Sequence, residues 1–207
     1  MMEVAELIER TRSDVLRDVP APQLFSEDSM VSYANEAYRL FVRTTHAFVD
    51  TISLDTVAGT DRYELGEDTI FVRGVVNAFG QSLGSYTRKS KPGAFNGKPT
   101  HYTTDGRHKT IRFWPNPDDV YELQIERAYL PALVTIDDVI ELDYDYALLL
   151  ADRIAYLCLR NNDPDGSETI DADQFQVSWL AGLRNAKMEY TRMAMGDHTS
   201  VQPRRWT

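Results

Sequence analysis

Two long helices joined by a short acidic turn are the strongest pattern of apolar and polar positions in the chain. From about residue 144 to 160, most polar side chains fall within roughly a third of the helical circumference at about 3.6 residues per turn. Apolar side chains fill the other two-thirds, so this helix is predicted to be central and contacted on several sides. The expected outer third consists of Asp145, Leu149, Asp152, Arg153, Tyr156 and Arg160.

The second helix of this pair, from about residue 170 to 195, has a narrower apolar stripe. Spacings of four and three keep the stripe on one side of the helix, facing a single partner. The stripe consists of Phe175, Trp179, Leu183, Ala186, Tyr190 and Met193. An antiparallel helical hairpin is therefore predicted.

Two more helices are predicted before residue 60. Val4, Ile8 and Val15 lie on one face of the first, which Pro20 and Pro22 are expected to stop. Ser26 is a suitable N-cap for the second. Its predicted stripe runs for five turns through Met30, Ala34, Ala37, Phe41, Thr45 and Phe48. Both helices are expected to pack on the C-terminal hairpin.

From about residue 61 to 131 the apolar period changes to two, which is typical of strands. The clearest alternation runs from 121 to 129, and Asn96-Gly97 and Asp105-Gly106 are hairpin dipeptides. The predicted fold class is α+β, a helical bundle with an inserted small antiparallel β-sheet or barrel. We expect a helical body at 1–60 and 132–196, a β subdomain at 61–131 and an extended tail at 197–207. A separate second domain is the alternative.

The net charge of −10 is concentrated in the predicted helices. Residues 61–135 hold 9 acids and 10 bases, whereas 136–207 hold 13 acids and 7 bases. Since phosphate contacts require clustered Lys and Arg, this surface argues against a nucleic-acid grip. No apolar run approaches the roughly 18 residues of a membrane span. The single cysteine, Cys158, lies on the apolar face of the central helix and suits a reducing compartment.

No pattern of catalytic residues is found, so an enzyme is disfavoured, and no cofactor or metal is predicted. The four histidines are scattered, and phosphate-loop, dinucleotide and zinc spacings do not occur. The turn from 161 to 166 imitates a calcium loop, but its twelfth position is Ala172 instead of a glutamate. A plain turn explains it better. The acidic run of Asp137, Asp138, Glu141, Asp143 and Asp145 is expected to be solvated.

Two basic segments are candidate partner interfaces. The segment from Thr87 to Arg112 holds seven bases and one acid, and Tyr86, Phe95, Tyr102 and Trp114 lie within it or next to it. Nucleic acid or an acidic neighbouring subunit could bind there, or the loop could simply be solvated. The tail is expected to be disordered alone and to anchor on a partner. The candidate interface residues are Arg88, Lys89, Lys91, Lys98, Arg204, Arg205 and Trp206.

Several short motifs follow one another along the chain: Phe25-Ser26 with 33–37, Gly59–Leu65, Tyr102 with Asp105-Gly106, Trp114-Pro115 with Pro117, Arg127–Pro131, and the final helices with Asp163, Asp165, Phe175, Trp179, Lys187 and Arg192. The order of these motifs resembles that of the bacteriophage head-to-tail adaptors. The chain is similar in particular to the podophage kind, which includes tail tubular protein A.

The resemblance implies a structural virion protein assembled in the host cytoplasm. It implies a twelvefold homo-oligomeric ring, with the portal protein above it and a tail or nozzle protein below it. DNA would leave through its channel without sequence-specific binding, which suits an acidic surface. The competing hypothesis is a non-catalytic binding module whose β subdomain recognises a saccharide or protein through exposed Tyr86, Tyr102 and Trp114.

Overall fold

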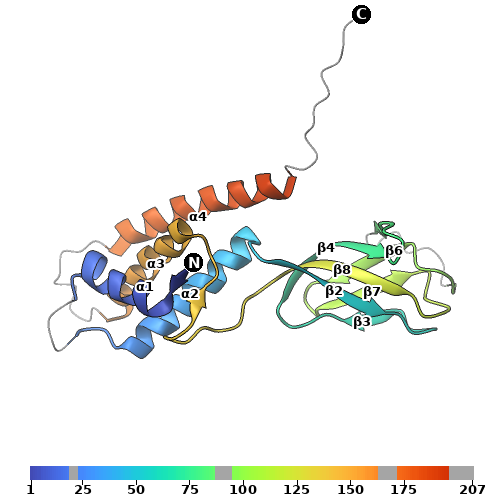
Figure 1. Ribbon diagram of the computed structural model, residues 1–207, viewed down its shortest axis with the longest axis horizontal. Helices are drawn as coiled ribbons and strands as arrows, with labels where there is room; N and C mark the ends of the chain where they lie inside the picture. Colours follow the sequence, from blue (N-terminus) through green and yellow to red (C-terminus); the bar gives the residue numbers. More distant parts are fainter. Residues whose placement is uncertain (19–22, 87–94, 163–171, 196–207) are drawn as a thin grey trace, which may run out of the picture. The chain divides into compact units, whose positions relative to one another are not determined.

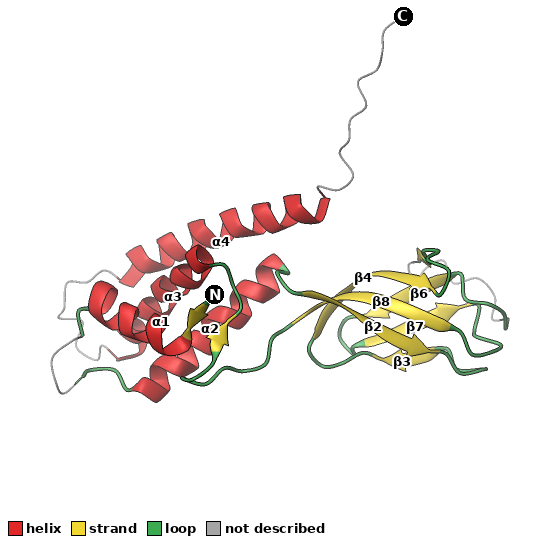
Figure 2. Ribbon diagram, in the orientation of Figure 1, coloured by secondary structure: helices red, strands yellow, loops and turns green. Residues whose placement is uncertain are grey.

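The chain folds into a helical unit and a β unit, seen in the computed structural model in Figures 1 and 2. The structure describes residues 1–18, 23–86, 95–162 and 172–195. Met1–Thr45 and Ala132–Thr207 form the helical unit, and His46–Pro131 form the β unit. Helices and mainly antiparallel strands occur in separate parts of the chain, which confirms the α+β class.

The helical unit contains four α-helices and a two-stranded sheet among its described residues. Its elements are β1 (Met2–Glu3), α1 (Val4–Arg10), the π-helical turn η1 (Thr11–Leu16), α2 (Glu27–Thr45), β9 (Val139–Ile140), α3 (Tyr144–Asn162) and α4 (Ala172–Met195). The short strands β1 and β9 pair with each other, so the start of the chain lies beside the segment that precedes α3.

Helix α3 is the centre of the helical unit, as its apolar pattern predicts. Leu150, Ile154 and Cys158 are fully buried, and α1, η1, α2 and α4 all contact this helix. The expected exposure of Tyr156 is wrong. Its ring is covered by the guanidinium groups of Arg153 and Arg160, 5.1 and 5.6 Å from the ring centroid, and Arg160 donates a hydrogen bond to its hydroxyl.

The stripe predicted along α4 is confirmed over the middle of the helix. Trp179, Leu183 and Ala186 are buried. Met193 is exposed, contrary to the prediction. The hydroxyl of Tyr146, near the start of α3, donates a hydrogen bond to Glu189 of α4. The last turn of α4 therefore lies beyond the end of its partner helix.

The first helical segment ends at Leu16, before the prolines expected to stop it. Arg17 follows in the left-handed conformation, with φ 56° and ψ 30°. Asp18 then accepts a 2.8 Å hydrogen bond from Arg12 and two more from the amides of Leu24 and Phe25. The side chains of Arg12 and Asp18 are only 9% and 2% exposed. This buried ion pair holds together the two ends of the connection between the first two helical segments.

Helix α2 begins at the predicted cap but is shorter than expected. The Ser26 hydroxyl accepts a hydrogen bond from the Ser29 amide at 3.2 Å. Met30, Ala34, Ala37 and Phe41 are fully buried. The helix ends at Thr45, because His46 adopts a φ of 56°. Phe48, the expected last member of the stripe, instead stacks on Tyr129 of the β unit at 5.8 Å.

The β unit is formed by two sheets with an apolar core. Its strands are β2 (Val49–Asp55), β3 (Arg62–Glu64), β4 (Thr69–Asn77), β5 (Gly84–Ser85), β6 (His101–Asp105), β7 (Thr110–Trp114) and β8 (Glu122–Tyr129). One sheet has the order β2-β8-β4 and the other β3-β7-β6-β5. The core cluster consists of Leu65, Val75, Leu83, Tyr102, Ile111, Phe113, Leu123 and Ile125.

Strand β2 and one turn differ from the expectations. Residues up to 60 were expected to be helical, but β2 is a strand that pairs with β8 over seven positions. Asp105-Gly106 begins the β6–β7 hairpin as predicted. Asn96-Gly97 does not connect a hairpin, because Asn96 instead forms a parallel bridge with Asn116.

Arg127 connects three parts of the β unit. From the central strand β8 it donates hydrogen bonds to both oxygens of Asp50 on β2 and to both oxygens of Asp68, and a further one to the Thr69 hydroxyl at 2.7 Å. Burial lowers its pKa, but the bonds to Asp50 and Asp68 outweigh this and raise it. The guanidinium of Arg127 thus joins strand β2 to the start of β4.

Leu150→Ala and Ile154→Ala should each lower the free energy of unfolding by about 2–5 kcal/mol, because each opens a cavity in a fully buried site. Asp152→Ala is the matched control on the same helix. Its half-buried carboxylate accepts one hydrogen bond from Ser178 at 2.6 Å, so a loss of about 1 kcal/mol is expected. Urea unfolding followed by far-ultraviolet circular dichroism measures the three values. Equal losses would contradict the orientation of α3.

Arg127→Lys should destabilise the β unit by about 1.5–3 kcal/mol, because an ammonium cannot make the paired bonds to two carboxylates. Arg73→Lys is the control, since Arg73 forms an exposed ion pair with Glu126 at 3.1 Å. Its expected cost is under about 0.5 kcal/mol. Amide hydrogen exchange in β2 and β8 measures both. If these amides are as well protected from exchange in the Arg127→Lys variant as in the native protein, the bidentate bonds do not stabilise the sheet.

Candidate functional site

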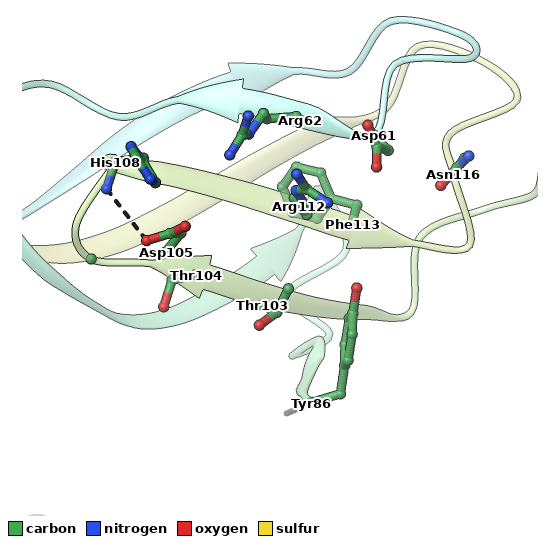
Figure 3. A pocket seen from close by; sticks show the side chains of 11 residues that line it. Asp61, Arg62, Tyr86, Thr103, Thr104, Asp105, His108, Arg112, Phe113 and Asn116 are labelled. Atoms are coloured by element: carbon green, nitrogen blue, oxygen red, sulfur yellow. Dashed lines mark hydrogen bonds between the residues drawn. The ribbon is translucent and has the colours of Figure 1, made fainter. Parts of the chain in front are cut away.

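A groove on one face of the second sheet holds the charged side chains that are best placed to contact a partner (Figure 3). Arg62 of β3 lies directly opposite Arg112 of β7, and Arg112 lies opposite Thr103 of β6. Side chains at directly opposed positions share one face of a sheet, and like charges there repel each other. Among the described residues, neither guanidinium has a hydrogen bond or an ion pair. The two guanidinium groups can therefore donate hydrogen bonds to a bound partner.

The ends of the groove are acidic. Figure 3 shows Asp61 at one end and Asp105 with His108 at the other, with the two arginines between them. Desolvation opposes a fall in the pKa of Asp105, but hydrogen bonds from the amides of His108 and Arg107 outweigh it and lower that pKa. Both ends of the groove therefore disfavour a long anionic ligand.

Tyr86 supplies a hydroxyl at the groove. Burial raises its pKa, and the charge of Arg112 only partly offsets that effect. The phenol is therefore protonated at neutral pH and can donate a hydrogen bond. The groove has a volume of about 640 Å³. The two guanidiniums and the hydroxyls of Tyr86 and Thr103 in this space suit a single carboxylate or phosphate, held between the acidic ends.

The predicted interface residues are mostly outside the described residues. This applies to Arg88, Lys89 and Lys91 and to the tail residues Arg204, Arg205 and Trp206. Lys98 is described and does not line the groove. Its ammonium lies 5.4 Å from the ring centroid of Phe79, beside a separate hollow of about 230 Å³.

Two further bases of the segment from Thr87 to Arg112, and one base outside it, have clear positions in the structure. Lys109 has a structural role, because its ammonium donates to the Thr69 carbonyl at 2.5 Å. Arg112 lies in the groove, together with Arg62, which was not among the candidate interface residues. Arg62 stands alone among neutral and acidic neighbours in the sequence, so only the strand register reveals its partner.

The aromatic platform expected for a saccharide does not form. Tyr102 is buried in the core of the β unit. Trp114 is half-buried between Phe95 and His101, with ring centroids 5.0 and 5.7 Å away. Of the three predicted aromatics, Tyr86 alone lines the groove. These positions weaken the saccharide-binding hypothesis.

The calcium-like turn, the acidic run and the single cysteine were the other candidates for chemistry. The calcium-like turn continues into 163–171, outside the described residues, and no metal-ligating cluster occurs within the described ranges. The acidic run from Asp137 to Asp145 is exposed, as expected. Burial raises the pKa of Cys158 to about 12, so its thiol is protonated and unreactive. No described helix is long and apolar enough to span a membrane.

Comparison with known proteins identifies the family. The model of the SU10 adaptor protein family matches residues 2–205, nearly the whole chain. The comparison with curated proteins gives no match. The family match confirms the resemblance to head-to-tail adaptors, while the podophage subtype stays a prediction. The chain therefore belongs to the SU10 adaptor protein family and is a structural adaptor of the bacteriophage head-to-tail type.

Proposed function

We propose that twelve copies of this chain form a ring that joins the portal to the tail and surrounds the channel through which DNA leaves the head. The family match over residues 2–205 carries this proposal. The portal above and a tail or nozzle protein below are the expected partners. The number of copies rests on the resemblance of the chain to head-to-tail adaptors.

The charge distribution supports a channel that DNA passes without binding. The chain has a net charge of −10. At physiological salt, charge repulsion acts over a Debye length of about 8 Å, so an acidic wall keeps a nearby duplex from adhering. The paired arginines of the groove do not alter this argument, because Asp61 and Asp105 flank them. A continuous row of phosphates would meet carboxylates at both ends.

An adaptor role also accounts for the absence of catalytic motifs from the sequence. The side chains of the groove can hold an anion, but holding one requires no reaction. Asp105 accepts hydrogen bonds from backbone amides, and Tyr86 keeps its proton at neutral pH. A recognition surface uses fixed donors and acceptors of this kind.

The tail from 197 to 207 is the proposed anchor on the portal. It lies outside the described residues, so the proposal rests on its sequence. Two guanidiniums, Arg204 and Arg205, suit paired carboxylates, and the indole of Trp206 suits an apolar pocket. A ring presents the tail once per copy, so that weak anchors reinforce each other after the first has docked.

Deleting residues 197–207 should abolish assembly onto the portal and leave the melting temperature of the free chain unchanged. The measurement mixes the protein with cognate portal rings, followed by sedimentation and negative-stain imaging. Arg107→Ala is a control that removes one exposed base from the β unit. If the truncated chain joins the portal as well as the full chain does, the tail is not the anchor. The loop from Arg88 to Lys98 is then the next candidate.

A further inference from the structure

Helix α4 has a second apolar side that faces solvent. Val177, Leu180 and Met188 are 67%, 48% and 47% exposed. At about 100° per residue, they and Arg184 fall within an arc of roughly 80°. The buried Trp179, Leu183 and Ala186 lie on the other side of the helix. We call the solvent side the α4 outer face, consisting of Val177, Leu180, Arg184, Lys187, Met188 and Arg192.

The α4 outer face carries three bases, although the protein as a whole is acidic, and Asp173 is the acid on the same side of the helix. Arg184, Lys187 and Arg192 are all exposed. Among the described residues, none of the three makes an ion pair. The nearby Glu189 instead accepts a hydrogen bond from the hydroxyl of Tyr146. Three cations beside exposed apolar side chains are suited to an acidic surface that also has apolar side chains.

Such a surface exists on the segment that leads into α3. Leu133 and Val139 are 65% and 43% exposed, and Asp137, Asp138 and Glu141 are exposed around them. We call these five residues the acidic face. Asp138 accepts hydrogen bonds from the amide and hydroxyl of Thr135, both at 2.7 Å, so the segment has a defined turn.

Contacts with α2 fix the position of the acidic face. The side chain of Asn35 bonds both the amide and the carbonyl of Val134 at 2.8 Å. The hydroxyl of Tyr38 accepts a hydrogen bond from the Glu141 amide at 3.3 Å. Both ends of the segment are therefore attached to the same side of α2.

The acidic face and α4 lie on different sides of α2. Phe41 and Glu36 of α2 contact α4 and α3, with Phe41 6.4 Å from Trp179 and Glu36 bonded to Arg153 at 2.8 Å. The direction of Phe41, which contacts α4, differs by roughly 90° from the mean direction of Asn35 and Tyr38 on a helix with about 100° per residue. Figure 1 shows α4 along the upper edge of the helical unit, and the chain after residue 131 runs along the lower edge before it rises to α3. The two faces are therefore different surfaces of one copy.

We propose that the α4 outer face of one copy packs against the acidic face of a second copy. The charges are complementary, and the exposed apolar side chains would form the centre of the contact with a polar rim. Because the two faces are different surfaces of one unit, the contact is heterologous: each copy presents one face to one neighbour and the other face to the next. Such contacts close into rings when the rotation between copies permits. This inference rests on the proposed ring and adds the surfaces that form it.

Disulfide trapping between two full-length variants tests the contact. Met188→Cys and Val139→Cys each add one exposed thiol, whereas the native Cys158 is buried. We expect a mixture of the two variants, mildly oxidised, to give a covalent dimer on a non-reducing gel. Neither variant alone should give it. Met188→Cys mixed with Arg107→Cys, whose site lies on the β unit, is the control for random collision.

A charge exchange tests the electrostatic part of the contact. Adding Arg184→Glu to the Met188→Cys variant should reduce the trapped fraction by about tenfold or more, because like charges then face each other. Adding Glu141→Lys to the Val139→Cys variant should restore it. Failure of this restoration, or equal trapping in the Arg107→Cys control, overturns the proposed contact.

Trapping in the presence of portal rings separates this inference from the proposed function. If rings form on the portal but the pair does not cross-link, the contact is wrong and the adaptor function stands. If the pair cross-links but no ring joins the portal, the contact stands and the proposed function falls. If neither occurs, both fall. Cross-linking of the Met188→Cys thiol to the portal, with no dimer of the chain, also overturns the inference.

Discussion

Helix α3 can bury its apolar surface only if segments that come before the β unit in the sequence and segments that come after it surround this helix. The helices α1 and α2 come before that unit and α4 comes after it, yet all three contact α3. The pairing of β1 with β9 and the bonds from Asn35 to Val134 hold the returning chain against the first helices. The helical unit is therefore complete only after the whole β unit has been made.

The β unit satisfies this constraint because its two ends meet. The entry strand β2 pairs with the exit strand β8, with Val49 opposite Ala128, and the amide of Tyr129 bonds the carbonyl of Phe48 at 3.2 Å. Arg127 reinforces the same junction through Asp50. With entry and exit side by side, the intervening residues do not separate α2 from the segment leading to α3. Compact β structure and compact helical structure can thus share one chain.

The charged groups divide into those that stabilise the fold and those available to partners. Arg12 with Asp18, and Arg127 with Asp50 and Asp68, are satisfied within their own units. The groove with Arg62 and Arg112, the α4 outer face and the acidic face hold charged side chains that form no ion pair among the described residues. For an adaptor, whose role is attachment, charged surfaces that are available to partners are the expected functional feature.

Local periodicity in the sequence was enough to predict much of the fold. The apolar faces of α2, α3 and the middle of α4 and the alternating strand β8 follow from it, because each pattern spans one element and reports which side is buried. Ser26 as a helix cap and Asp105-Gly106 as a hairpin turn are similarly local. The sequence of the whole chain also carried the family resemblance, through the order of short motifs.

Only the tertiary structure decided the features that depend on distant residues. Strand β2 has a weak alternation and is defined by its partner β8, about seventy residues later. Tyr156 is buried because two arginines cover its ring, although its position on the helix wheel indicates exposure. Arg62 meets Arg112 only through the register of β3 and β7. A helical or strand period gives the direction of a side chain, whereas its partner depends on how elements far apart in the sequence pack.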